Sequence, residues 1–173
     1  MKKLFMLLTI LLLSVSLFAS VKNTLSAGLS FVGINGIEEK HRNGLTIGAY
    51  ADDKLVFGER RTYNMMSLIR SDASYAINGT GSFDGVCWDL FSGAGVLVRP
   101  FDGFELEACL GGGLFVAISD DPIFDLTAGV YSSLGYGIGD EESIILSLSS
   151  NIVYGILFHS VYYTVSAGAG FRF

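Results

Sequence analysis

Apolar side chains recur at every second position through most of this 173-residue chain. In residues 104–118 they occupy the even positions, apart from glycine, whereas Glu105 and Glu107 occupy odd ones. Such alternation separates the two faces of a β-strand, and a helix with its period of 3.6 would mix them. The pattern persists over 16 residues in 62–77 and 13 residues in 86–98. An ordinary strand has about five or six residues, so the sequence predicts unusually long strands.

Turn-forming residues interrupt this alternation at nearly even spacing. Their clusters are centred near residues 39, 59, 79, 101, 121, 140 and 158, about twenty residues apart. Seven turns divide the chain into eight segments, and hairpins between long strands give this spacing, whereas parallel units need longer crossovers. We therefore expect an all-β fold, a closed antiparallel up-and-down β-barrel of eight strands, in which residues 24–34 pair with residues 161–173.

The composition of the two strand faces is unusual for a soluble sheet. Glycine and serine fill the less apolar face, where a water-facing sheet would carry more Lys, Glu and Thr. Nearly all charges within the segments share this face, and small residues suit the narrow interior of an eight-stranded barrel. With the apolar face outward, the fold would be a transmembrane β-barrel. We predict lumen-lining charges at Asp52, Arg70, Asp72, Asp89, Arg99, Glu105, Glu107, Asp125 and Arg172, with Lys54 among them.

Aromatic residues near the segment ends support this orientation. On the apolar face they would form one rim of Phe57, Tyr63, Phe104, Tyr136, Phe171 and Phe173, and another of Phe31, Tyr75, Phe124 and Phe158. Paired aromatic girdles mark the two interfaces of membrane barrels. The alternative is a secreted lipocalin-like binding protein, in which apolar residues point inward. Asp53 falls on the apolar face of its segment, and a bulge at Asp52 and Asp53 could turn its carboxylate away.

The first residues have the features of a secretory signal. Lys2 and Lys3 precede an apolar stretch, and a short run of Ser and Ala follows it, ending near Ala19. We expect residues 1–19 to be a cleavable signal peptide and residues 20–173 to be an outer-membrane β-barrel. The alternative is an N-terminal membrane anchor, because the uncharged run is near the lower length limit for a spanning helix.

The C-terminal segment carries the most specific signal. Its apolar positions are Tyr163, Val165, Ala167, Ala169, Phe171 and Phe173. This pattern resembles the C-terminal β-signal by which the barrel assembly machinery recognises outer-membrane proteins, and Tyr163, Val165, Phe171 and Phe173 would form that signal. In pattern the whole chain is similar to the small eight-stranded barrels of the OmpA, OmpX and OmpW type. The resemblance implies a bacterial outer-membrane location with both termini in the periplasm. It also implies that outer-membrane lipid and the barrel assembly machinery are partners.

Few residues suggest catalysis or metal binding. His159 is the only histidine beside a candidate nucleophile, Ser160, but adjacent residues point to opposite faces of a strand and no acid follows Glu142. The pair departs from the H-x-S arrangement of lipid A deacylases, which resemble this barrel in size, and we predict that the chain is not an enzyme. No Cys/His cluster has metal-ligand spacing, so we expect no metal and no cofactor. Cys87 and Cys109 would point inward at an offset of six residues, too far apart for a disulfide.

The inward charges leave two functions open. A formal net charge of −6 argues against nucleic-acid binding, which needs a basic face. Buried charges must pair, so the acids and bases of the lumen are expected to form an ion-paired plug in a barrel with a structural or surface role. The alternative is a narrow channel for small polar or cationic solutes, made possible by the inward glycines.

Overall fold

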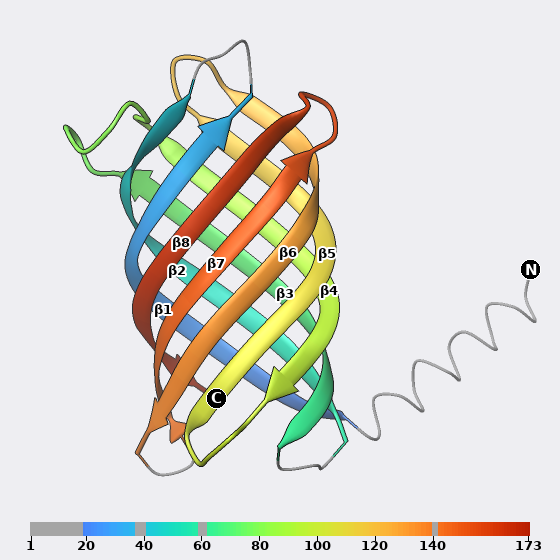
Figure 1. Ribbon diagram of the computed structural model, residues 1–173. Coiled ribbons are helices and arrows are strands. Elements are labelled where there is room, and N and C mark those ends of the chain that lie inside the picture. The colour runs from blue at the N-terminus through green and yellow to red at the C-terminus, as the bar shows by residue number, and fades with distance from the viewer. Residues whose placement is uncertain (1–18, 37–40, 59–61, 140–141) are drawn as a thin grey trace, which may run out of the picture.

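The computed structural model describes residues 19–36, 41–58, 62–139 and 142–173. Its strands are β1 (Ala19–Asn35), β2 (Arg42–Phe57), β3 (Tyr63–Ala76), β4 (Val86–Val98), β5 (Phe104–Ile118), β6 (Ile123–Ile138), β7 (Ile144–Gly155) and β8 (Ser160–Arg172). Each strand pairs antiparallel with the next, and β8 returns to β1, so the predicted closed barrel of eight strands is confirmed (Figure 1). Residues 1–18 of the expected signal peptide, and parts of the turns near 39, 59 and 140, lie outside the described residues.

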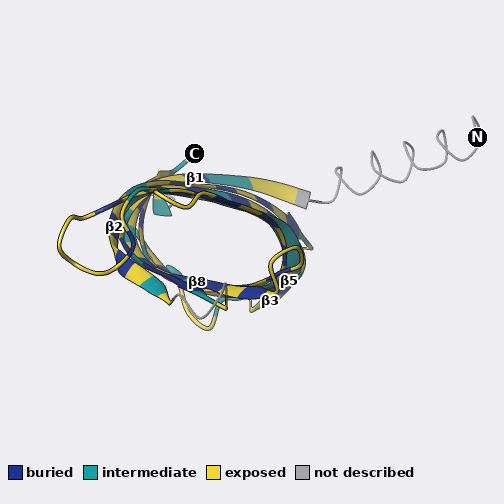
Figure 2. Cartoon of the chain, turned by 90° about the horizontal axis from the view of Figure 1, so that it is seen from above, coloured by how far each residue is buried: buried dark blue, intermediate teal, exposed yellow. Residues whose placement is uncertain are grey.

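The barrel closes along the seam between its terminal strands. Thr24 pairs with Arg172 and Asn35 pairs with Val161, as the sequence predicted. Seen from above, the strands form a single-layered ring (Figure 2). Along this seam β1 is paired on both sides, with β2 and with β8, so its edge is not left open there. Within the described ranges, no helix is long and apolar enough to cross a membrane.

Neighbouring strands are strongly staggered. Following the cross-strand pairs once around the barrel from Val161 leads to Phe173, twelve residues further along the same strand. Stagger, tilt and width are linked in a barrel. A barrel whose stagger exceeds its number of strands therefore has more steeply tilted strands and a wider interior than one in which the two are equal. The tilt is plain in Figure 1. A wider interior needs large side chains to fill it.

The two faces of the wall carry different side chains. Along β3, buried and outward residues alternate over almost the whole strand. Large apolar side chains lie outside, and Ile69, Leu110 and Leu146 are 50%, 70% and 45% exposed. This exposure is the reverse of a lipocalin-like barrel, whose apolar side chains would point inward.

Asp53 lies on the outer face. The pairing of β2 with β3 continues without a break through Asp52 opposite Arg70 and Asp53 opposite Ile69. No bulge therefore turns the carboxylate inward. On the other side Asp53 is opposite Asn23 of β1.

Two hairpins differ from the sequence-based expectations. The turn predicted near residue 79 is a connection of nine residues between Ala76 and Val86, longer than a tight hairpin turn. It is longer because Phe83 folds into the mouth of the barrel, where it is 3% exposed and donates its backbone N–H to the Asn43 carbonyl at 2.8 Å.

The register of the β4–β5 hairpin also differs from the predicted one. Cys109 lies opposite Gly95, whereas the predicted offset of six residues from Cys87 would place it opposite Gly93, so the offset between the cysteines is larger than expected. Gly103 adopts a left-handed φ of 80°, which moves the tip of the turn one residue along the chain. Cys87 and Cys109 are free and buried, as predicted.

Candidate functional site

The structure places the predicted lumen charges within the barrel or at the end where the chain termini lie. Asp52, Arg70, Asp72, Asp89, Glu105, Glu107 and Asp125 are buried, and Arg99 and Arg172 are half-buried. The Lys54 ammonium lies 2.5 Å from Glu107. Because β2 and β5 are not neighbours in the barrel, this ion pair crosses the interior.

The terminal ion cluster, at the end of the termini, consists of Lys22, Lys54, Arg99, Glu105, Glu107 and Arg172. Glu105 is its centre: Arg172, Arg99 and Lys22 approach its carboxylate to 2.5, 2.7 and 3.3 Å. Glu107 pairs with Lys54 and also accepts a hydrogen bond of 2.8 Å from the Ser133 hydroxyl. Charge-assisted bonds of this kind are the stronger hydrogen bonds in proteins. The cluster ties β1, β2, β4, β5, β6 and β8 together.

The central cluster, further up the lumen, consists of Asp52, Arg70, Asp72, Asp89 and Asn151. The Arg70 guanidinium lies 2.9 Å from Asp52 and 3.6 Å from Asp72. It also donates hydrogen bonds of 3.3 Å across the lumen to Tyr131 and Ser149. The Asn151 amide donates to Asp89. The cluster thus contains three carboxylates and one guanidinium, which contacts two of them.

An apolar cap closes the opposite end of the lumen. It consists of Val32, Ile34, Phe83, Phe115 and Tyr162, each no more than 3% exposed. The rings of Phe115 and Tyr162 stack at a centroid distance of 4.2 Å. Phe83 reaches this cap from the β3–β4 connection and lies against Gly44.

The inward glycines leave room that aromatic rings occupy. A Cβ added to Gly28 would lie 2.8 Å from the Tyr50 hydroxyl, and one added to Gly168 would lie 2.8 Å from the Tyr50 ring. Tyr50 therefore extends over Gly28 and Gly168, and its ring fills the space beside these two glycines. Five inward rings were not predicted from the sequence, although their positions have the parity of the small-residue face: Tyr50, Phe91, Phe115, Tyr131 and Tyr162.

One hollow between the two ion clusters is very small. A hollow bounded by Asp52, Lys54, Glu105, Glu107 and Tyr131, among others, measures about 10 Å³. A water molecule needs a volume of about 10–15 Å³ measured in this way. This hollow has room for about one water.

Asp125 has a different role from the other inward acids. Its carboxylate accepts hydrogen bonds from the Leu157 and Phe158 backbone N–H groups at 2.8 and 3.4 Å, and from the Tyr162 hydroxyl at 2.7 Å. It therefore fixes the β7–β8 hairpin at the rim. His159 lies in that turn with a left-handed φ of 51°, its ring exposed and its Nδ1 2.8 Å from the Tyr154 hydroxyl.

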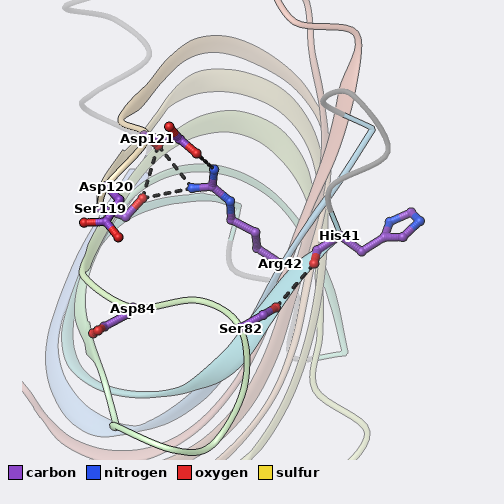
Figure 3. A pocket seen from close by; sticks show the side chains of 7 residues that line it. All are labelled: His41, Arg42, Ser82, Asp84, Ser119, Asp120 and Asp121. Atoms are coloured by element: carbon purple, nitrogen blue, oxygen red, sulfur yellow. Dashed lines mark hydrogen bonds and ion pairs between the residues drawn. The ribbon is translucent and has the colours of Figure 1, made fainter.

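An open hollow of about 600 Å³ lies at the end of the barrel opposite the chain termini, called the loop end below (Figure 3). Its lining residues are His41, Arg42, Ser82, Asp84, Ser119, Asp120 and Asp121. The Arg42 guanidinium spans it, 2.5 Å from the Asp121 carboxylate and 3.0 Å from the Ser119 hydroxyl. Three carboxylates against one guanidinium make this rim acidic. In the part of the chain that the structure describes, no three His, Cys, Asp or Glu side chains group to hold a metal ion.

Comparison with solved structures identifies the fold. The chain is similar to Ail, the attachment invasion locus protein of Yersinia pestis, in complex with the heparin analogue sucrose octasulfate, at 15% identity and a TM-score of 0.51. That match covers 89% of this chain and 99% of Ail. Neisserial surface protein A matches at 11% identity and a TM-score of 0.56, covering 90% of this chain and 99% of that one. No protein-family model and no curated protein sequence matches. At these identities the likeness establishes the fold, a small eight-stranded barrel of the kind found in outer-membrane proteins.

Proposed function

We propose that this chain is an integral bacterial outer-membrane protein whose lumen is an ion-paired plug and whose activity resides in the surface at its loop end. The observation that carries the proposal is the distribution of side chains. Large apolar residues cover the outside, while charged residues meet inside the wall. Water would have to solvate that apolar exterior in a soluble protein, whereas lipid matches it.

Trp88 provides a direct test, because it is the only tryptophan in the chain. Its indole is 37% exposed on the outer face and donates a hydrogen bond of 2.9 Å to the Ser71 hydroxyl. In vesicles of brominated phospholipid, we expect strong quenching of the Trp88 fluorescence and weak quenching by aqueous acrylamide. Quenching by acrylamide alone, or a chain that stays monomeric in buffer without detergent, would contradict a membrane location.

The plug is favoured over a narrow channel by the way the interior is filled. The terminal ion cluster, the central cluster with its rings, and the apolar cap succeed one another along the lumen. Each of these levels contains side chains that reach across from non-neighbouring strands, such as Lys54 to Glu107 and Arg70 to Ser149. A solute would have to displace all three levels, so small polar solutes are not expected to pass.

The C-terminal strand is proposed to carry the signal for the barrel assembly machinery. Val165, Phe171 and Phe173 are 43%, 68% and 77% exposed on the outer face. A partner could therefore contact them while β8 still lacks its neighbour β1. We further propose that the termini lie in the periplasm, which directs the rim hollow toward the exterior.

The surface role is proposed to involve partners with positive or neutral polar groups. Ail was solved with a heparin analogue, which is a polyanion. The rim of this chain instead presents Asp84, Asp120 and Asp121 beside a single arginine. Like charges repel, so we expect sucrose octasulfate to bind this protein weakly if at all.

A further inference from the structure

The central cluster holds more negative charge than its own residues neutralise. Asp72 and Asp89 are direct cross-strand partners on β3 and β4, and both side chains are buried in the lumen. Like charges placed directly opposite each other destabilise a sheet. Asp52 adds a third carboxylate, and Arg70 supplies one positive charge. The nearby Lys54 is committed to Glu107 at 2.5 Å.

Two oxygen atoms in this cluster are buried without a donor. The Asn151 amide nitrogen is hydrogen-bonded to one carboxylate oxygen of Asp89. The other oxygen of Asp89 and the amide oxygen of Asn151 have no hydrogen-bond partner among the described residues. Each residue is only 6% exposed. Buried acceptors that are left unsatisfied are costly, and a hydrogen-bond donor or a cation removes that cost.

We propose that the central cluster binds one divalent cation through carboxylate oxygens of Asp72 and Asp89 and the amide oxygen of Asn151. Carboxylate and amide oxygens are the ligands of hard cations, and Ca²⁺ tolerates irregular geometry better than Mg²⁺ does. Two positive charges match the excess of three carboxylates over one guanidinium. This assignment is independent of the proposed surface role.

The surroundings of the cluster determine how the cation would enter. The apolar cap lies above it and the terminal ion cluster lies below it, so a cation would have to pass one of these levels to reach it. The cation would therefore bind while the barrel folds and exchange slowly afterwards. Calcium must then be present during refolding for its effect to be measured.

The test is refolding of residues 20–173 into detergent micelles with CaCl₂ or with EDTA, at a constant NaCl concentration. Metal content is measured by mass spectrometry after gel filtration, and thermal unfolding is followed by circular dichroism. Asp89→Asn and Asp72→Asn remove a proposed ligand charge with almost no change in shape. Asp53→Asn is the matched control, because it makes the same chemical change on the outer face.

We expect one calcium per chain in the wild type and in Asp53→Asn, and much less in Asp72→Asn and Asp89→Asn. Calcium at a hundredfold excess over its dissociation constant should raise the unfolding temperature by about 5 °C or more. The two ligand variants should fold without calcium and lose this response. Wild-type protein with no bound calcium, a response equal in all variants, or stabilisation by acid in place of calcium would overturn the proposal. The last result would mean that a proton neutralises the cluster.

Discussion

At the scale of single residues, Arg70 links four strands. From β3 its guanidinium reaches Asp52 on β2, Tyr131 on β6 and Ser149 on β7. Its carbon atom also lies 4.8 Å from the centre of the Tyr50 ring and 5.2 Å from that of Tyr131, within the range of cation–π attraction. Arg99 has a simpler setting, since it is 25% exposed and its partner Glu105 keeps Arg172 and Lys22.

The first prediction compares these two arginines. Arg70→Met should lower the free energy of unfolding by about 3–5 kcal/mol, because it leaves buried carboxylates without their cation. Arg99→Met should cost about 1 kcal/mol or less, because Arg99 is only half-buried and Glu105 keeps Arg172 and Lys22. Urea unfolding in lipid vesicles measures both values. Equal losses in the two variants would show that Arg70 contributes no more to stability than Arg99 does.

A second prediction concerns Asp53, the one charged side chain that the described strands place on the outer face. In a membrane this carboxylate faces lipid, beside Ile69 and Asn23. An outward charge destabilises a barrel according to its depth, so Asp53→Leu should stabilise the protein by about 1 kcal/mol. Urea unfolding in the same vesicles checks this. A loss of stability would instead indicate that Asp53 has a partner in the membrane.

At the scale of elements, the seam between β1 and β8 depends on one close approach. Gly33 is opposite Tyr163, whose ring covers it: a Cβ on Gly33 would lie 2.0 Å from that ring. The Phe31 ring lies nearby, 6.0 Å from that of Tyr163 between centroids. An aromatic ring that covers a glycine on the neighbouring strand fixes the register of the pair.

The third prediction tests this seam. Gly33→Val would force the Tyr163 ring off the strand, and overpacking of this kind costs about 1–3 kcal/mol. We expect a lower yield of the folded barrel on a heat-modifiability gel and a lower unfolding midpoint. Ala27→Val is the control, since Ala27 lies on the outer face of the same strand opposite two other alanines. If both variants behave alike, the contact of Tyr163 with Gly33 does not set the register.

The strands were predictable because apolar side chains alternate with small or charged ones, and this alternation shows for each strand which side chains face outward. The inward position of the charges follows from it, whereas the strand number follows from the even spacing of the turns. The predicted register of the β4–β5 hairpin was wrong by two residues. The register depends on the left-handed conformation of Gly103 and not on the alternation of side chains. The partners across the lumen were not predictable, because Lys54 meets Glu107 and Asp89 meets Asn151 only through the stagger of the whole barrel.

At the scale of the whole molecule, the stagger of twelve explains how the interior is filled. A barrel of eight strands with this stagger is wide enough to need more than small side chains inside. Five large rings and two ion clusters occupy that space, and glycines beneath the rings make their packing fit. The glycines considered alone suggest a conduit, whereas their closeness to the Tyr50 ring supports the proposed plug.

The fourth prediction follows from this layered filling. Wild-type protein refolded into a planar bilayer should give no steady conductance, because three successive levels of side chains must move before an ion can pass. Arg99→Ala should also stay silent, since Glu105 keeps two other cations and the two levels above are unchanged. Phe83→Ala combined with Phe115→Ala removes only the cap and should stay silent as well. A porin added to the same bilayer serves as the positive control. Steady wild-type currents, reduced in cation preference by Glu105→Gln with Glu107→Gln, would instead establish the narrow channel and would require the ion clusters to line it.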